Sequence, residues 1–471
     1  MIGRKRELAD LQKYYDSGKP EFVALYGRRR VGKTFLIEQF FANKYSFKVS
    51  GVVEGDAEVQ YSAFNIAMRE YGYEGRFPTD WMLIFNQLSK MLDKKIRKKR
   101  RCVIFVDELP CFDTPKSKFV KALGHFWNTW CSTHNEVMLV VCGSATSWMV
   151  KNIIDNHGGL HNRITHEMHI HPFTLNETEQ MLKSQGVQWD RLAIAQMYMA
   201  IGGVPYYISL VERGESVVQA LDRMFFGEEA VLRNEYERLF SSLFKEPAPY
   251  IAILDFLSTC KEGVSRERIA EAIKKQDGGH LTEYLNNLQR CDFVRYYSVK
   301  GRNGLRKTGG LYQITDFFIV FHNTFLKNRT TNASYWSQHL NTPKINTWNG
   351  LAFERLCMAH ITQIKHALGI DRIATEYFSW RSKQSEEGAQ IDLVIERADR
   401  VTNVCEIKYS EGDYRIDKAE ERSIRNRCED FRNETKTRNS VVTTLVTTFG
   451  MRANEYSSAI NAVVTLDELF L

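Results

Sequence analysis

The amino-acid sequence predicts an α/β fold that begins with a parallel sheet. Runs rich in β-branched and aromatic residues recur at 22–26, 102–108 and 137–142, each long enough for a buried strand. Segments with helical spacing of apolar residues separate these runs, and strands that alternate with helices form parallel sheets. Further strands are expected at 45–52 and 165–170, and helices near 57–70, 81–93 and 117–133.

Length and composition indicate several domains. The 471 residues correspond to about three domains, and 43% hydrophobic with 26% charged residues supply enough apolar material for separate cores. The formal net charge of +7 permits a polyanionic partner without requiring one. The nine cysteines form no C-x-x-C pair, which is typical of reduced thiols. Because no apolar signal region or long apolar stretch occurs, we expect a cytoplasmic protein that does not interact with membranes.

An octapeptide with the pattern G-x-x-x-x-G-K-[ST] follows the first predicted strand and precedes a helix-like stretch. Its glycines let the backbone curl until N–H groups point inward, and the helix N-terminus adds partial positive charge. Lys33 would reach the β- and γ-phosphates of ATP, and the Thr34 hydroxyl would hold Mg²⁺. An ordinary tight turn is the alternative. The predicted nucleotide-binding residues here are Gly27, Arg28, Arg29, Arg30, Val31, Gly32, Lys33, Thr34 and Phe35.

Polar side chains follow the second and third predicted strands. At the carboxyl edge of a parallel sheet, Asp107 would assist the metal and Glu108 would polarise the attacking water. Ser144 follows the third strand, and its hydroxyl could orient the water or sense the γ-phosphate. The alternatives are a solvated strand end for the acidic pair and a helix cap for the serine.

Five short motifs, taken in order, resemble the archaeal-type ATPases, which are P-loop NTPases of the AAA+/STAND branch. The resemblance covers about the first half of the chain. It implies that residues 2–8 lie against the adenine and that the sheet has the additional-strand arrangement with Glu108 as base. It also implies that Gly203-x-Pro205 opens a helical lid near the nucleotide, with Pro205 as a binding residue. The motifs are Ile2-Gly3-Arg4-x-x-Glu7-Leu8, the octapeptide, Val106-Asp107-Glu108, Gly143-Ser144 and Gly202-Gly203-Val204-Pro205.

Two basic features have alternative interpretations. Arg163 falls where such ATPases often carry an arginine that acts in trans, which contributes about 10³–10⁵ in rate and requires an oligomer. It could equally be a surface residue before a strand. The segment 94–101 holds seven basic side chains in eight positions. It could grip a nucleic-acid backbone, or it could be a solvated helix end.

Between about 248 and 327 the pattern changes to three short amphipathic helices, the second capped by Ser265, followed by a β hairpin. Three helices and a hairpin suggest a winged helix, whose third helix is not an obvious base reader. The domain could contact phosphates or act as a spacer. Residues 328–347 are interpreted as a surface connection. The basic residues of the predicted wing are Lys300, Arg302, Arg306 and Lys307.

The last quarter contains two strand-like runs joined by turn residues at 397–403. In a paired hairpin, Asp392 and Glu406 could converge on one metal, and alternation puts Lys408 on the face of Glu406. Two carboxylates and an ammonium fit Mg²⁺-assisted hydrolysis of a phosphodiester. The ion would lower the pKa of its bound water toward about 7, and Lys408 would hold the hydroxide.

The helix start Trp348-Asn349-Gly350-Leu351-Ala352-Phe353-Glu354, followed by Asp392 and Glu406-x-Lys408, resembles the PD-(D/E)xK restriction-endonuclease-like superfamily. It is specifically similar to the nuclease-like domain that follows a winged helix in many archaeal-type ATPases. The resemblance implies metal-side carboxylates at Glu354, Asp392 and Glu406, catalytic Lys408 and support from Gln390. The proline of the superfamily's name is absent before Asp392.

The expected domains are a P-loop ATPase core at 1–175, a helical lid at 176–245, a winged helix at 246–330 and a restriction-endonuclease-like α/β domain at 345–471. We expect an ATPase whose nucleotide state controls a nuclease-like module that acts on nucleic acid, DNA more than RNA. The alternative is a STAND-type signalling switch that binds nucleic acid or protein without cleaving it. A metabolic nucleotide kinase is disfavoured because it would not use the chain beyond the first domain.

Overall fold

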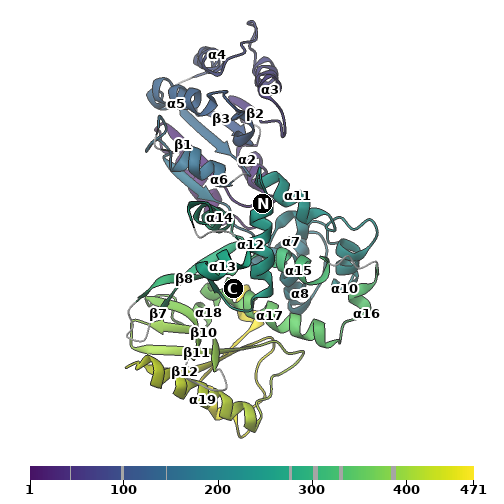
Figure 1. Ribbon diagram of the computed structural model, residues 1–471. Helices are drawn as coiled ribbons and strands as arrows, with labels where there is room; N and C mark the ends of the chain where they lie inside the picture. Colours follow the sequence, from purple (N-terminus) through teal and green to yellow (C-terminus); the bar gives the residue numbers. More distant parts are fainter. Residues whose placement is uncertain are drawn as a thin grey trace. The chain divides into compact units, whose positions relative to one another are not determined.

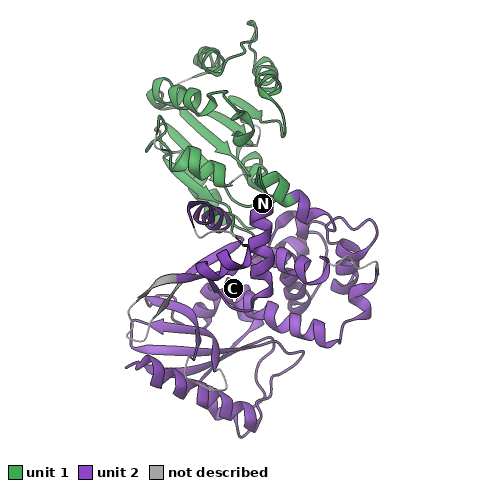
Figure 2. Cartoon of the chain, in the orientation of Figure 1, with its two compact units in different colours: residues 1–172, 239–247, 290–292 green, residues 173–238, 248–289, 293–471 purple. Residues whose placement is uncertain are grey.

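The computed structural model describes residues 1–42, 44–96, 100–144, 146–156, 158–274, 278–300, 306–327, 332–382 and 389–471. These residues form two compact units, coloured separately in Figure 2. Unit 1 comprises Met1–Pro172, Leu239–Pro247 and Arg290–Asp292. Unit 2 comprises Phe173–Arg238, Ala248–Gln289 and Phe293–Leu471. The chain therefore enters unit 1 three times, and the two later segments are short.

Unit 1 contains a five-stranded parallel sheet in the order β2-β3-β4-β1-β5 (Figure 1). Strand β4 lies between β1 and β3, which is the expected additional-strand arrangement. Every residue of β3 and β4 is buried, which explains why these strands are continuous apolar runs. The strands expected at 45–52 and 165–170 are confirmed. The bounds are Glu21–Tyr26 for β1, Phe47–Ser50 for β2, Cys102–Asp107 for β3, Val137–Cys142 for β4 and His166–His169 for β5.

Helices pack on both faces of this sheet. Alternate residues of β1 contribute to two cores: Phe22 packs with the helices α3, α4 and α5, and Val23 packs with α1 and α2. The three helices expected near 57–70, 81–93 and 117–133 are confirmed. Asp56 and Asp80 cap α3 and α4 by accepting hydrogen bonds from first-turn N–H groups. The bounds are Lys5–Tyr15 for α1, Lys33–Phe41 for α2, Ala57–Glu70 for α3, Trp81–Asp93 for α4, Phe119–Thr129 for α5 and Thr146–Met149 for α6.

Unit 2 begins with short helices in the region where a helical lid is expected. A capping box at Thr174 starts α7, because Thr174 accepts from the Glu177 N–H and Glu177 accepts in return. Among the described residues, no helix combines the length and apolar content needed to span a bilayer. The helices are α7 (Leu175–Ser184), α8 (Arg191–Ile201), α9 (Pro205–Ile208), α10 (Val217–Leu221), α11 (Glu235–Leu243, across the boundary at residue 238), α15 (Phe317–Phe325) and α16 (Tyr335–Gln338).

Three helices and a small antiparallel sheet occupy the middle of the chain. Ser265 caps α13 by accepting from the Arg268 N–H, as expected. Of the predicted wing residues, Arg302 and the side chains of Lys300, Arg306 and Lys307 lie outside the described part, as does 97–99 of the basic segment. The elements are α12 (Ala248–Thr259), α13 (Arg266–Ala272), α14 (Gly279–Arg290), β6 (Val264–Ser265), β7 (Val294–Lys300) and β8 (Arg306–Ile314), in the sheet order β6-β8-β7.

A second five-stranded sheet, in the order β13-β12-β11-β10-β9, forms the carboxyl-terminal part of unit 2 (Figure 1). Strands β9, β10 and β11 are antiparallel neighbours, and β11, β12 and β13 are parallel neighbours. Its bounds are Thr375–Arg381 for β9, Gln390–Arg397 for β10, Val401–Lys408 for β11, Ser440–Thr447 for β12 and Ala462–Thr465 for β13. The nearby helices are α17 (Pro343–Ala359), α18 (Ile361–Ala367) and α19 (Lys418–Thr435).

Two sequence-based boundaries are wrong in this region. The turn between β10 and β11 is shorter than 397–403, because Thr402 and Asn403 pair with β10 and are buried. Asn403 also donates a hydrogen bond of 3.1 Å to Thr444 of β12 inside the sheet. The expected surface connection at 328–347 contains α16 and the start of α17, which begins at Pro343, where a missing N–H costs nothing.

Candidate functional site

The octapeptide at 27–34 curls tightly between β1 and α2. Gly27, Arg30 and Gly32 have φ angles of 136°, 70° and 86°, in the left-handed region. A Cβ on Gly27 would also lie 2.4 Å from the carbonyl oxygen of Ile170. Glycine is therefore required at position 27 both for its backbone conformation and for the close approach of β5. The curl directly before α2 is the geometry that a phosphate loop needs.

Lys33 and Thr34 have polar contacts that hold them at this loop. The Lys33 ammonium donates to the carbonyl oxygens of Gly27 and Arg28, both at 2.9 Å. It is buried, and burial lowers the pKa of Lys33. The Thr34 hydroxyl donates to Asp107 Oδ2 at 2.8 Å. A cation inside the curl and a hydroxyl paired with a carboxylate could hold a triphosphate and a divalent ion.

The acidic pair and Ser144 meet at the ends of β3 and β4. The Ser144 hydroxyl donates to Glu108 Oε2 at 2.8 Å, and the Ser144 N–H donates to the same oxygen at 3.3 Å. Burial raises the pKa of Asp107, although the hydrogen bond from Thr34 opposes this. Glu108 has φ 43°, an uncommon value for a non-glycine residue and one that is often associated with functional sites.

The amino-terminal segment contacts the phosphate loop through Arg4. The Arg4 guanidinium is buried, donates to the carbonyl oxygen of Val31 at 2.9 Å and lies 3.3 Å from Glu7 Oε1. Residues 2–8, which the family resemblance associates with the adenine, therefore lie beside the loop.

The remaining predicted nucleotide-site residues differ in burial and location. Arg28 is buried, Arg29 and Arg30 are partly buried, and the Phe35 side chain is 56% exposed. Arg163 lies on the surface of unit 1. Pro205, which was also predicted to be a nucleotide-binding residue, is in unit 2, where it is the first residue of α9.

The second predicted set of side chains lies in unit 2. Asp392 directly precedes the antiparallel pair Leu393–Cys405, and Glu406 directly follows it, so the two carboxylates are on neighbouring strands. The pairing of β10 with β9 shifts at this point, and such a bulge can redirect a side chain. Lys408 Nζ lies 2.9 Å from Glu406 Oε1, on the same face, as strand alternation predicts.

Electrostatic interactions connect Glu354 on α17 to this cluster. Burial, and next the charge of Asp392, raise the pKa of Glu354 to about 7. Burial, and next the charge of Glu406, raise the pKa of Asp392 to about 6. The three carboxyl groups are therefore close enough to repel one another. A divalent cation could replace the protons that relieve this repulsion.

Sequence reasoning missed two residues of this cluster. On α19, Arg427 Nη1 lies 2.8 Å from Glu406 Oε2, and Glu420 Oε1 lies 3.4 Å from Lys408 Nζ. Glu420 and Arg427 are seven residues apart, so helical spacing could have placed them on one face. Their partners on β11 could not have been found from that spacing.

A cavity of about 610 Å³ adjoins the cluster. Its lining includes Glu354, Gln390 and Asp392 together with two arginines, Arg295 and Arg355. Burial lowers the pKa of Arg355 to about 10, and its Nε and Nη1 atoms are buried without a hydrogen-bond partner. An anionic group in the cavity could satisfy these donors.

Curated relatives and solved structures resemble this chain. An uncharacterized protein of Methanocaldococcus jannaschii is 27% identical over 329 residues, which cover 68% of this chain and 67% of that protein. An uncharacterized ATP-binding protein of the same organism is 49% identical over 43 residues, 9% of this chain and 73% of that protein. A Walker-type ATPase of Pyrococcus abyssi aligns with TM-score 0.48 and 14% identity over 69% of this chain and 96% of that one. The ORC2 protein of Aeropyrum pernix aligns with TM-score 0.42 and 13% identity over 72% and 95%.

A family model described as "ATPase domain predominantly from Archaea" matches residues 1–211. The matched range includes the whole parallel sheet of unit 1, the phosphate loop and the Gly202–Pro205 motif. Residues 1–211 are therefore similar to ATPase domains of archaeal type, and this similarity supports ATPase activity of the chain.

Proposed function

We propose that the ATPase controls a Mg²⁺-dependent nuclease-like module that acts on nucleic acid, DNA more than RNA. The observation that carries this proposal is the cluster of Glu354, Asp392, Glu406 and Lys408 from α17, β10 and β11, beside a cavity lined by arginines. Oxygen ligands suit Mg²⁺, and the nearby ammonium and guanidinium groups suit a phosphodiester.

In the ATPase, Lys33 would neutralise the β- and γ-phosphates, and Thr34 with Asp107 would hold Mg²⁺. Glu108 would polarise the attacking water. The Ser144 hydroxyl, which donates to Glu108 at 2.8 Å, could instead donate to a phosphate oxygen. This exchange would release the base when the nucleotide is in place, and Ser144 would then act as the sensor.

In the nuclease-like module, Asp392 and Glu406 would coordinate the metal, with Glu354 nearby. The raised pKa values of Glu354 and Asp392 mean that a cation would displace protons as it binds. Lys408 would hold the attacking water, and a bound metal would supply the lowering of that water's pKa. Arg355, with its unsatisfied donors at the cavity, would bind a phosphate of the substrate.

The domain roles and the oligomer are also part of this proposal. The segment at 246–330 would be a winged helix, 176–245 would be a helical lid, and 345–471 would be the PD-(D/E)xK-like domain, after the core at 1–175. Arg163, exposed in unit 1, would act in trans on the nucleotide of a second copy.

One observation favours a second function, a signalling switch without cleavage. Both oxygens of Glu406 already face cations, with Lys408 on Oε1 and Arg427 on Oε2. A carboxylate satisfied in this way has less need of a metal ion. The module would then bind nucleic acid or protein, and ATP would time the interaction.

Cleavage assays with Mg²⁺ or Mn²⁺, with and without ATP, distinguish the two functions. Wild type should cut DNA, and Asp392→Asn should abolish cutting. In Lys33→Met, cutting should no longer depend on whether ATP is present. Glu429→Gln, an exposed position on α19, is the matched control and should behave as wild type. If wild type binds DNA without cleaving it, and Asp392→Asn binds DNA equally well, the signalling switch would be the correct function and the nuclease would be wrong.

A further inference from the structure

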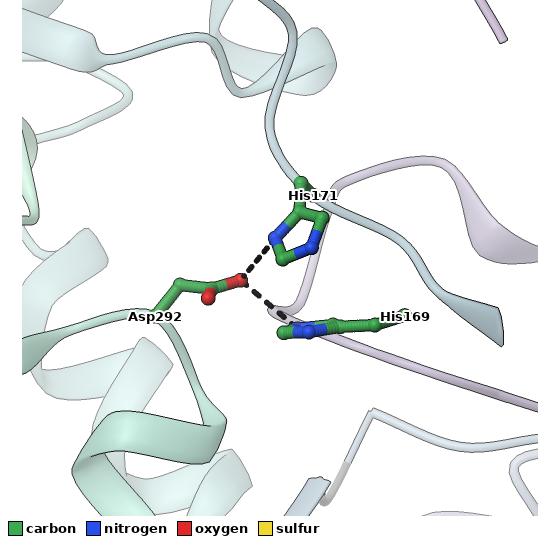
Figure 3. Close-up of side chains that lie close together, drawn as sticks. All are labelled: His169, His171 and Asp292. Atoms are coloured by element: carbon green, nitrogen blue, oxygen red, sulfur yellow. Dashed lines mark hydrogen bonds and ion pairs between the residues drawn. The ribbon is translucent and has the colours of Figure 1, made fainter. Parts of the chain in front are cut away.

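We propose that His169, His171 and Asp292 form a binding site for one divalent transition-metal ion, with Zn²⁺ the best fit, in unit 1 (Figure 3). This site is separate from the metal ions proposed above for ATP and for the nuclease-like module. His169 ends β5, His171 follows two residues later, and Asp292 belongs to the short segment Arg290–Asp292 that returns to unit 1.

The spacing of the ligand atoms matches a coordination shell. Asp292 Oδ2 lies 3.0 Å from His169 Nε2 and 3.1 Å from His171 Nδ1, and the three atoms lie within 4.8 Å of one another. Two ligands about 2.1 Å from an ion are about 3.0 Å apart at a right angle and about 3.4 Å apart at a tetrahedral angle. A small shift of the side chains would therefore admit the ion.

The environment of His169 Nε2 is an independent indication of a ligand. This atom is buried from solvent and makes no hydrogen bond, even though Asp292 Oδ2 is 3.0 Å away. A buried ring nitrogen that is close to a carboxylate but not aligned with it as a donor is unusual. A cation between the two atoms would give the His169 ring nitrogen a partner.

Neighbouring side chains hold the ligand groups of this site in position. The carboxylate of Asp292 lies against both imidazoles, 3.0 Å from His169 Nε2 and 3.1 Å from His171 Nδ1. The Tyr26 ring stacks on His169 with centroids 4.8 Å apart, which fixes the orientation of that imidazole.

The donor set selects the class of metal. Two imidazole nitrogens and one carboxylate oxygen suit Zn²⁺ and its first-row neighbours, whereas Mg²⁺ and Ca²⁺ prefer oxygen ligands alone. Three protein ligands leave a position for water. The bound ion would connect the Arg290–Asp292 segment to β5. This connection would add to the 3.0 Å ion pair between Arg290 and Asp155, which also holds the segment.

The ion would also act next to the phosphate loop. His169 pairs with Tyr26 in the sheet, and the Ile170 N–H donates to the Tyr26 carbonyl oxygen at 2.9 Å. Gly27, the first residue of the loop, packs against the carbonyl of Ile170. The metal would therefore stiffen the backbone against which the loop begins.

Isothermal titration of the full, chelator-treated chain with Zn²⁺ tests the proposal. Wild type should bind one ion per chain at this site, and His169→Ala or Asp292→Ala should weaken that binding at least tenfold. His171→Ala is a second ligand variant that keeps the packing intact, because its side chain is 61% exposed. His166→Ala is the matched control on the same strand and should bind as wild type, since His166 pairs with Glu21.

Cobalt substitution identifies the ligands independently of affinity. Co²⁺ at this site should give visible d–d bands without a thiolate-to-metal charge-transfer band, and His171→Ala should change them. Stoichiometric Zn²⁺ binding that the ligand variants leave unchanged would overturn the proposal. A thiolate band would do the same, because it would assign the ion to cysteine, and so would a wild type that binds no Zn²⁺.

Discussion

Replacing Glu354 by glutamine should make strands β10 and β11 harder to open at pH 8 but not at pH 4. The Glu354 carboxyl has a pKa raised from 4.5 to about 7, mainly by burial and next by Asp392. Below pH 4 the carboxyl is protonated whether the protein is folded or unfolded, so it does not lower the free energy of unfolding. As pH rises, the unfolded chain loses the proton first, and the folded state becomes progressively less favoured until pH exceeds the folded pKa.

The magnitude follows from that difference of pKa. About 2.5 pH units correspond to roughly 3.4 kcal/mol at most, at about 1.36 kcal/mol per unit. Because Asp392 titrates together with Glu354, part of this cost is shared, and we expect the glutamine variant to gain about 2 kcal/mol at pH 8. The neutral amide keeps the shape of the carboxyl group and removes the charge.

Native-state hydrogen exchange of peptides covering 390–408 measures this gain locally. Exchange corrected for its intrinsic pH dependence should slow about 30-fold at pH 8 and remain unchanged at pH 4. Glu429→Gln, at an exposed position of α19, should show no change at either pH. Equal slowing at both pH values, or faster exchange at pH 8, would refute the assignment of a charged, crowded carboxyl to Glu354.

Three further predictions concern other parts of the chain. Lys33→Met should lower ATP affinity at least tenfold and abolish turnover, measured with a fluorescent nucleotide and phosphate release; unchanged turnover would remove the loop from catalysis. Gly27→Ala should destabilise unit 1 by roughly 1–3 kcal/mol in calorimetry, because its Cβ would meet the Ile170 carbonyl at 2.4 Å, and an unaltered transition would contradict this. Asp316→Ala should cost about 1–2 kcal/mol in urea unfolding, because Asp316 caps α15 at 2.9 Å from the Ile319 N–H, whereas Asp316→Asn should retain most of the cap.

Local patterns explain what could be predicted from the sequence. Strands β1, β3 and β4 of unit 1 are largely apolar runs, and the phosphate loop is a contiguous motif, so both could be placed to within a few residues. The convergence of Asp392, Glu406 and Lys408 also depends on one hairpin, whose alternation is readable from the sequence. The helix start at Pro343 was missed because the surrounding Asn, Thr and Ser residues are typical of loops.

Contacts between distant segments could not be predicted. Arg427 contacts Glu406 from α19, a helix that follows β11 in the chain. Arg355 is next to Glu354 in the sequence, but the lack of hydrogen-bond partners for its Nε and Nη1 atoms becomes evident only in the folded chain. The pair His169 and His171 has the spacing of one strand face, which is a readable hint. Asp292 lies 121 residues after His171, and only the folded chain brings it to the two rings.

The hydrogen bond from Asn403 to Thr444 connects β11 to β12 and so affects the position of Glu406 on β11. A slip of β11 by one position would strand this amide in an apolar interior and turn Glu406 toward the opposite side of the sheet. This hydrogen bond between two uncharged side chains outside the cluster thus contributes to the register that aligns the acidic groups. Substitutions at Asn403 should consequently disturb the metal binding proposed for Asp392 and Glu406 while leaving every charged group present.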